Sequence, residues 1–318
     1  YVSYVDRFGF MGVSISGGEP FLTFDRTLDY LKALRQSRPD LHLWMYTNGK
    51  LATVEKLRQL AAAGLNEIRF DISAFDYDLS AVEMASDIIQ TITVEIPAIP
   101  EDIELLRSLL PVMADAGVHH LNLHQVRCTP HNRDNLVARG YTFIRGMKPT
   151  VLESELTALE ILAYAAGQQL PLPVNYCSFP YKNRYQAAAW RKRLASQITG
   201  TCEEPTATGY IRALYLHAPV AVLEDVITGL NTADEGTLYQ LNRSRERLYL
   251  HPSLIHRVSA NLPLRATYYN PLMLQSVSYR NMFREIQLDT GYRLVLEKYP
   301  VLEDRELTQQ EVESITRN

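Results

Sequence analysis

Short apolar runs alternate with stretches that repeat apolar residues at helical spacing along the first two-thirds of the chain. The apolar runs predict buried strands near residues 12–16, 41–47, 67–72, 91–96, 119–124 and 171–176. The stretches between them predict helices near residues 24–37, 52–63, 80–90, 101–116 and 152–168. Gly64 and Gly117 directly follow two of these helices, as C-capping glycines do. The repeat predicts an α/β fold, in which a parallel sheet covered by helices forms an open or closed barrel.

The pattern changes near Thr201, which predicts a barrel domain over residues 1–200 and a second domain over residues 201–318. Residues 210–217 predict a strand, and residues 219–230 predict a helix with a proline near its first position. A hairpin is expected over residues 284–302, with Asp289-Thr290-Gly291 as its turn, and Thr308–Glu311 has capping-box spacing. These elements predict a small α+β domain, to which the sequence assigns no role.

The composition is typical of a soluble globular protein, because the 318 residues are 46% hydrophobic and 21% charged. A net charge of −4 gives no electrostatic reason to expect nucleic-acid binding. The chain contains no apolar run long enough to predict a membrane span. Its three cysteines are odd in number and widely spaced, which argues against a disulfide framework and favours a reducing cytoplasm.

Ser16-Gly17-Gly18-Glu19-Pro20 follows the first predicted strand and is the most informative motif of the chain. Two glycines let a backbone pass close to a ligand, and Pro20 restricts the direction in which the chain leaves the turn. Glu19 would accept hydrogen bonds from a ligand ammonium group. A tight strand-to-helix turn without any ligand would also explain both glycines. About thirty residues later, the length of one βαβ unit, a second predicted strand ends in Thr47-Asn48-Gly49.

This pair of motifs resembles the radical S-adenosylmethionine superfamily, and most of all the branch related to the pyruvate formate-lyase activating enzymes. The resemblance implies a partial (β/α) barrel, with S-adenosylmethionine and a 4Fe–4S cluster as cofactors. It implies an electron donor such as flavodoxin or ferredoxin, and hydrogen abstraction from a small-molecule or protein substrate by a 5′-deoxyadenosyl radical. It also implies that the methionine amino group is bound by the segment Gly17, Gly18, Glu19 and Pro20.

The cysteines depart from the family pattern. The superfamily holds its cluster with a CxxxCxxC loop upstream of the Gly-Gly-Glu-Pro strand, but Cys128, Cys177 and Cys202 lie 49 and 25 residues apart. The first residues read as the end of an amphipathic helix. We therefore expect a fragment that lacks the first strand and the cluster loop, has its cluster ligands N-terminal to Tyr1, and is inactive by itself. The alternative is a divergent member that has no cluster.

Polar residues end the predicted strands, and ligands of parallel sheets lie beyond the carboxyl ends of the strands. The resemblance implies that the cofactor carboxylate and ribose are bound by Thr47, Asn48, Asp71 and Ser73. It also implies that Pro97 lies beside the adenine. Tyr46 stands where the family has an aspartate that helps to bind a monovalent cation, so we do not expect that cation site. Polar strand ends also occur in barrels without a ligand at each position. The candidates are Thr47, Asn48, Asp71, Ser73, Pro97 and His124.

Cys177 is the thiol in the most favourable position, at the end of the last predicted strand and just before the basic segment 182–193. Nearby cations lower a thiol pKa, which makes Cys177 a weak catalytic candidate, as a hydrogen-atom donor or as a ligand of a second metal centre. The alternative is an inert, buried cysteine. The basic segment would bind phosphate, RNA or an acidic peptide, or would form a solvated helix face.

Residues between Leu121 and Gln186 resemble a subgroup described only as relatives of the activating enzymes, which extends the likeness to about residues 10–198. The predicted function is that of a radical S-adenosylmethionine enzyme. One form of this prediction is an enzyme that modifies a protein substrate, as the activating enzymes do. Two other functions stay open. One is a barrel without a cluster that acts as a binding or scaffold protein. The other is a TIM-barrel lyase or aldolase, although none of the six predicted strands contains the lysine that a Schiff-base aldolase would need.

Overall fold

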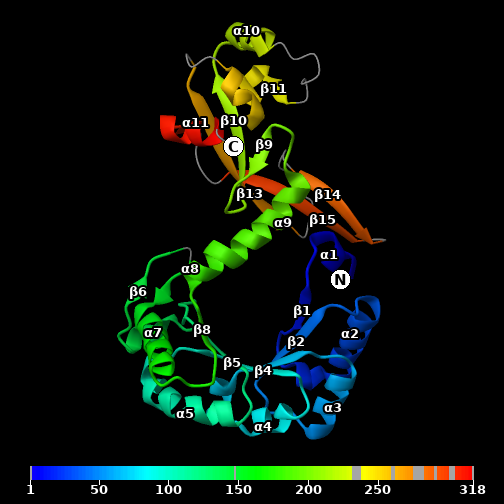
Figure 1. Ribbon diagram of the computed structural model, residues 1–318, viewed down its shortest axis with the longest axis vertical. Coiled ribbons are helices and arrows are strands. Elements are labelled where there is room, and N and C mark those ends of the chain that lie inside the picture. The colour runs from blue at the N-terminus through cyan, green and yellow to red at the C-terminus, as the bar shows by residue number, and fades with distance from the viewer. Residues whose placement is uncertain are drawn as a thin grey trace. The chain divides into compact units, whose positions relative to one another are not determined.

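The computed structural model describes residues 2–146, 148–230, 238–258, 262–274, 283–289, 292–300 and 305–316, in two compact units, Tyr1–Lys182 and Asn183–Asn318 (Figure 1). The first unit is built on a sheet of six strands, in which every neighbouring pair is parallel. The order is β1-β2-β3-β4-β5-β8, so β1 and β8 are edge strands and the sheet is open. The bounds are β1 Gly12–Ile15, β2 His42–Thr47, β3 Glu67–Phe70, β4 Thr91–Pro97, β5 His120–His124 and β8 Val174–Cys177.

Five helices connect these strands and lie along the outer side of the curved sheet (Figure 1). They are α2 Phe24–Ser37, α3 Val54–Ala62, α4 Ser80–Ser86, α5 Ile103–Asp115 and α7 Leu152–Gly167. Alternate strand residues face these helices and are buried with them in one core, which includes Leu43, Ile68, Val94, Leu57 and Leu110. The sequence prediction of a helix-covered parallel sheet is therefore confirmed, and so is the helical character of the first residues, which form α1 Val2–Phe8.

Several element boundaries differ by a few residues from those predicted. The last strand begins at Val174 rather than at residue 171, because Pro173 has no N–H to donate to a neighbouring strand. The helix expected over residues 52–63 begins at Val54, because the Thr53 hydroxyl caps it by accepting from the Lys56 N–H at 3.3 Å. The helix expected over residues 80–90 ends at Ser86.

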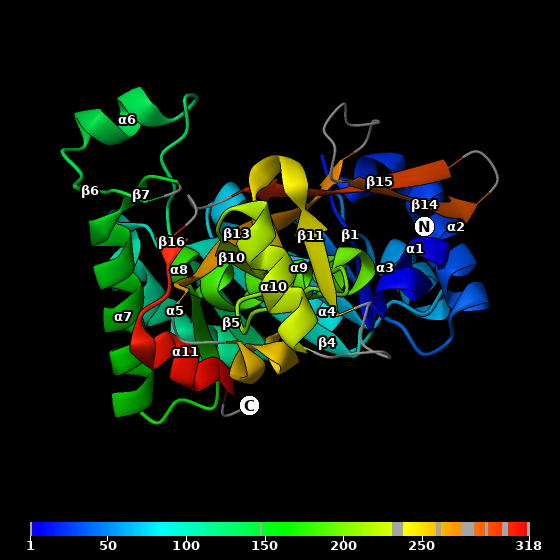
Figure 2. The same cartoon turned by 90° about the horizontal axis from the view of Figure 1, so that it is seen from above.

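Several short elements were not predicted. The segment between β5 and α7 contains α6 Arg133–Ala138 and a two-stranded ladder of β6 Phe143–Ile144 with β7 Thr150–Val151, and it stands out from the rest of the first unit (Figure 2). Elements of two to six residues are too short to show a periodic pattern. Three 3₁₀ turns follow strand ends, namely η1 Pro20–Thr23, η2 Ile72–Phe75 and η3 Pro100–Asp102.

The second unit contains an antiparallel sheet with the order β11-β12-β10-β13-β15-β14, in which β9 also pairs with β10 and β16 with β13. The predicted hairpin is confirmed as β14 paired with β15, while its turn residues Thr290 and Gly291 lie outside the described residues. The strands are β9 Glu203–Pro205, β10 Ile211–His217, β11 Tyr239–Asn242, β12 Arg247–Leu250, β13 Leu264–Leu274, β14 Phe283–Asp289, β15 Tyr292–Pro300 and β16 Arg305–Glu306. The helical elements are α9 Ala188–Ile198, α10 Val220–Leu230, η5 Arg243–Arg245, η6 Pro252–Arg257 and α11 Gln309–Thr316.

The predicted capping box at the start of α11 is confirmed. The Glu311 N–H donates to the Thr308 hydroxyl at 3.3 Å, and the Thr308 N–H donates to Oε2 of Glu311 at 2.9 Å. None of the described helices has both the length and the apolar composition that a membrane-spanning helix needs.

The division between the two units falls after Lys182, whereas the sequence pattern predicts it after residue 200. The difference is due to α9, which packs against β13 and β15 of the second sheet. The chain enters α9 through a short helix, α8 Phe179–Tyr181, and a π-helical segment, η4 Lys182–Ala187.

Candidate functional site

The turn after β1 has an open side. Gly17 and Gly18 adopt φ angles of +97° and +56°, which residues with a side chain rarely occupy. Both glycines are exposed, and a Cβ atom at either position would meet no atom within 4 Å. Pro20 is buried at the start of η1, where its carbonyl oxygen accepts a hydrogen bond from the Thr27 hydroxyl at 3.0 Å. The glycines are therefore required by the backbone conformation, and the turn that they form leaves room for a ligand beside the main chain.

Glu19 joins the ends of β1 and β2. Its Oε1 accepts hydrogen bonds from the Phe21 N–H at 3.1 Å and from the Thr47 hydroxyl at 2.8 Å. Its Oε2 accepts one from the Asn48 N–H at 3.0 Å. Because a carboxylate offers about four acceptor positions, these three bonds orient Glu19 and leave about one position, on Oε2, for a further donor.

Thr47 and Asn48 lie on either side of this carboxylate and have different roles. Thr47 is 5% exposed, and its hydroxyl accepts from the Gly49 N–H at 3.0 Å while it donates to Glu19. Thr47 therefore acts on Glu19 and is too buried to form a ligand-binding surface. Oδ1 of Asn48 accepts from the Lys50 N–H at 3.0 Å, and its side-chain nitrogen has no hydrogen-bond partner among the described residues.

Asp71 and Ser73 lie together just after β3, and both are half-buried. The Ser73 hydroxyl donates to Oδ1 of Asp71 at 2.6 Å, and the Asp71 N–H donates to the Thr47 carbonyl oxygen at 2.9 Å. Oδ2 of Asp71 accepts no hydrogen bond from the part of the chain that the structure describes. The candidates at the ends of β1, β2 and β3 are thus connected through Thr47, which contacts both Glu19 and Asp71.

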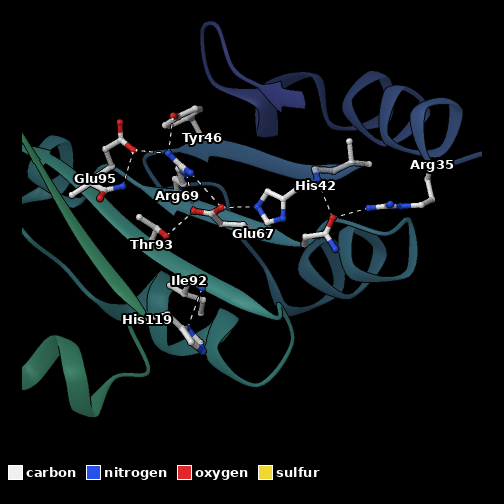
Figure 3. Close-up of polar contacts among 12 residues, drawn as sticks. Arg35, His42, Tyr46, Glu67, Arg69, Ile92, Thr93, Glu95 and His119 are labelled. Carbon is white, nitrogen blue, oxygen red and sulfur yellow. Dashed lines mark hydrogen bonds and ion pairs between the residues drawn. The ribbon is translucent and has the colours of Figure 1, made fainter. Parts of the chain in front are cut away.

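A polar network that the motifs did not reveal lies on the sheet face away from the helices (Figure 3). Arg69 of β3 is at its centre, where Nε donates to Oε1 of Glu67 at 2.7 Å and Nη1 donates to Oε2 of Glu95 at 3.0 Å. The Thr93 hydroxyl donates to Oε1 of Glu67 at 2.7 Å, and Nε2 of His42 lies 2.8 Å from Oε2 of the same residue. The network ties β2, β3 and β4 together through side chains as well as through the backbone.

Burial and charge in this network oppose each other at Glu67, which is 6% exposed. Burial disfavours its ionised form, but hydrogen bonds from Arg69, His42 and Thr93 outweigh burial and hold the pKa of this carboxyl below its usual value. The Arg69 guanidinium also lies 5.2 Å from the Trp44 ring centroid. Because Glu67 and Glu95 share one guanidinium, this face of the sheet carries an excess of negative charge and favours a cationic ligand.

The signal for this network was present in the sequence. Polar and apolar residues alternate along β3 and β4, as in Glu67-Ile68-Arg69-Phe70 and Thr93-Val94-Glu95-Ile96. Alternation of this kind indicates a strand with one buried and one accessible face. The polar positions before the strand ends therefore face the same side of the sheet, where Arg69 and Glu95 are half-buried and Glu67 and Thr93 are buried.

Pro97 of β4 and His124 of β5 are paired in register, and both line a pocket of 510 Å³. Phe179 and Lys182 line the same pocket, as does the unpredicted segment that contains α6. Burial lowers the pKa of His124, and the positive charge of Lys182 lowers it further. His124 is therefore expected to be neutral at physiological pH.

Cys177 is paired in register with His124 but does not line this pocket. It is half-buried, and none of the three cysteines forms a disulfide. In the described residues, no three His, Cys, Asp or Glu side chains come close enough together to hold a metal ion. The expectation that these cysteines hold no cluster stays a prediction, and so does the role of Cys177 as a catalytic thiol.

No family model matches the chain. The chain is 29% identical over 186 residues to a protein of Methanocaldococcus jannaschii named "Putative glycyl-radical enzyme activating enzyme". The match covers 55% of this chain and 48% of the relative, so the chain spans about half the length of the curated protein that it matches. This match confirms the resemblance to the activating enzymes that the Gly-Gly-Glu-Pro and Thr-Asn-Gly motifs indicate.

Solved structures with local similarity include two of the radical S-adenosylmethionine methyltransferase TsrM from Kitasatospora setae, each 16% identical to this chain. One has a tryptophan substrate and an S-adenosylmethionine analogue bound; it covers 38% of this chain and 28% of its own, with a TM-score of 0.30. The other has cobalamin and a 4Fe–4S cluster bound; it covers 46% of this chain and 36% of its own, with a TM-score of 0.34.

Proposed function

We propose that this chain binds S-adenosylmethionine and forms part of a radical enzyme related to the glycyl-radical enzyme activating enzymes. The observation that carries the proposal is the Glu19 carboxylate, which is held between two strand ends by Thr47 and Asn48 and keeps an acceptor position beside an open glycine turn. The sequence match to an activating enzyme of Methanocaldococcus jannaschii supports it.

Glu19 is the residue proposed to bind the ammonium group of the methionine moiety. The carboxylate is oriented before a ligand arrives, so binding does not have to order it. A hydrogen bond between an ammonium group and a carboxylate is charge-assisted and stronger than a neutral one. The exposed main chain of Gly17 and Gly18 would contact the same part of the ligand.

Asp71, Ser73 and the side-chain nitrogen of Asn48 are proposed to bind the ribose and carboxylate. Oδ2 of Asp71 suits a ribose hydroxyl, which can donate a hydrogen bond, and the Asn48 nitrogen suits the ligand carboxylate. Pro97 and His124 are proposed to contact the adenine, since they line a pocket at the ends of β4 and β5. The negative face formed by Glu67, Arg69 and Glu95 would favour the sulfonium charge.

A bound 4Fe–4S cluster would supply the electron that cleaves S-adenosylmethionine, and the adenosyl part of the cleaved cofactor would then remove a hydrogen atom from the substrate. The spacing of Cys128, Cys177 and Cys202, which lie 49 and 25 residues apart, does not fit the CxxxCxxC loop that holds such a cluster. We propose that the cluster ligands are N-terminal to Tyr1. A protein substrate, as for an activating enzyme, and an electron donor such as flavodoxin or ferredoxin belong to the same proposal.

The test is anaerobic reconstitution of the full reading frame with iron and sulfide, followed by reduction in the presence of S-adenosylmethionine. We expect brown cluster absorbance and formation of 5′-deoxyadenosine, measured by liquid chromatography. A complete reading frame that binds S-adenosylmethionine but never acquires a cluster would favour the scaffold function. A reading frame that does neither would contradict the proposal outright.

A further inference from the structure

The pocket at the ends of β4 and β5 has a basic lining. Arg127, Arg139 and Lys182 line it together with His124, and no aspartate or glutamate does. Its volume of 510 Å³ lies in the range of about 300–1,000 Å³ that small-molecule sites occupy. All the lining residues belong to the first unit. The pocket is thus large enough for a small molecule and has cationic groups but no lining anion.

Two of these cations have no anionic partner among the residues that the structure describes. The Lys182 ammonium lies 5.3 Å from the centroid of the Phe179 ring and forms no ion pair within the described residues. The Arg127 guanidinium also has no hydrogen-bond or ion-pair partner in the described part of the chain. Arg139 differs, because its Nη1 lies 3.3 Å from Oε2 of Glu101. The pocket therefore presents two cations that the described residues leave without an anionic partner, and Lys182 is half-buried.

The charged groups that act on His124 differ in sign and in whether they line the pocket. Lys182 lowers the pKa of His124, whereas Glu95 and Asp71 raise it, so all three charges act on the imidazole. Lys182 lines the pocket, and neither carboxylate does. A ligand that extends across His124 would meet carboxylates beyond the pocket and a cation inside it. A neutral imidazole has one ring N–H that can donate to an anion.

We propose that this pocket binds an anionic group of the substrate, a carboxylate or a phosphate, through Lys182 and Arg127. The substrate part of this inference rests on the proposed function, because the anion would lie beside the residues assigned to the adenosyl group. Asn135 also lines the pocket, and its side chain would provide a neutral donor to the same group. Lys182 and Arg127 would thus select an anionic group, while Phe179 supplies apolar contact.

The anion site can be tested by isothermal titration calorimetry of the 318-residue chain with two probes, inorganic phosphate and malonate. Lys182→Gln removes the half-buried cation, and Lys32→Gln removes the same charge from an exposed position on α2. We expect at least one probe to bind the unmodified chain and Lys32→Gln equally. Because a charge-assisted hydrogen bond is lost, Lys182→Gln should weaken that binding by about tenfold or more. The preferred probe distinguishes phosphate from carboxylate.

Arg127→Gln is the second variant, since Arg127 is exposed and its replacement leaves the helical run from Phe179 to Ile198 intact. It should also weaken probe binding, and circular dichroism would verify that both variants are folded. The anion site is refuted if neither probe binds, or if folded Lys182→Gln and Arg127→Gln bind as well as Lys32→Gln does.

A titration of S-adenosylmethionine with the probe present separates this inference from the proposed function. We expect both to bind together, because the anion site is assigned to the substrate. Competition would show that the basic residues serve the cofactor carboxylate, which overturns the assignment to substrate. If the probe binds but S-adenosylmethionine does not bind even to the full reading frame, the proposed function fails and the anion site stands without it.

Discussion

Glu19 has two functions at the scale of a single residue. Three protein hydrogen bonds hold it at the ends of β1 and β2, and a further acceptor position on Oε2 is proposed for the ligand. The sequence indicated the ligand contact but not the three internal bonds, because the partners Thr47 and Asn48 are about thirty residues away. Loss of Glu19 should therefore affect both folding and binding.

Glu19→Gln should reduce S-adenosylmethionine affinity by about tenfold, since it removes the charge that pairs with the ammonium group. Thr47→Val, which deletes only the hydroxyl that orients Glu19, should lower the free energy of unfolding by about 1 kcal/mol and weaken binding less. Calorimetry and urea denaturation measure the two quantities. Equal affinity in the unmodified chain and Glu19→Gln would remove Glu19 from the site, and Glu83→Gln on α4 is the matched control.

The strands and helices of the first unit could be predicted from the sequence, because apolar residues repeat at regular spacing along each of them. The polar face of the sheet was not predicted, although polar and apolar residues alternate along β3, because a short strand does not show which residues of neighbouring strands will contact Glu67 and Arg69. The segment with α6 was missed because it is irregular, although it lines the pocket beside His124. The spacing of apolar residues thus predicted the sheet, whereas the candidate site depends on contacts between residues that are distant in the sequence.

The Glu67 network should make the stability of the first unit depend on pH. The folded pKa of Glu67 lies below its ordinary value of 4.5, so the unfolded chain binds more protons in acid. The contribution of Glu67 is therefore complete above that ordinary value and is lost as the pH falls through the folded pKa. Glu67→Gln should be less stable than the unmodified chain at neutral pH, and the difference should shrink in acid. Parallel pH curves from urea denaturation would contradict this role.

Gly64 shows how a capping glycine connects elements. It ends α3 with a φ of +89°, and an added Cβ would lie 2.6 Å from Nε of Arg35. Arg35 cannot easily move, because its guanidinium donates to the Gly64 carbonyl oxygen at 2.6 Å and to Oδ1 of Asn66 at 2.7 Å. Asn66 Oδ1 in turn accepts from the Leu43 N–H at 2.9 Å, which connects α2, β2 and the approach to β3.

Gly64→Ala should therefore cost more than backbone strain alone. Gly140→Ala is the matched control, because Gly140 also has a positive φ, +71°, but open space where its Cβ would be. The strain is about 1–2 kcal/mol in both variants, and displacement of Arg35 adds to it only at Gly64. Gly64→Ala should have a lower melting temperature than Gly140→Ala. Equal melting temperatures would show that Arg35 moves aside without a loss of stability.

The cysteines bear on where the full reading frame would hold the proposed cluster. Cys128 and Cys177 belong to the first unit and Cys202 to the second, and the described residues do not bring three metal-binding side chains together. In the sequence the three lie 49 and 25 residues apart, which is not the spacing of a CxxxCxxC loop. The proposed S-adenosylmethionine site and the proposed cluster ligands would then lie on different segments of the full reading frame.

A variant of the full reading frame with Cys128, Cys177 and Cys202 all replaced by serine tests this division. If the cluster ligands are N-terminal to Tyr1, the triple variant should keep its brown absorbance and its cleavage of S-adenosylmethionine after reconstitution. Loss of the absorbance would mean that these cysteines hold the cluster after all. Loss of product formation alone would instead indicate a thiol that acts after the cofactor is cleaved. The single variant Cys177→Ser would then identify it, because Cys177 ends β8 beside His124.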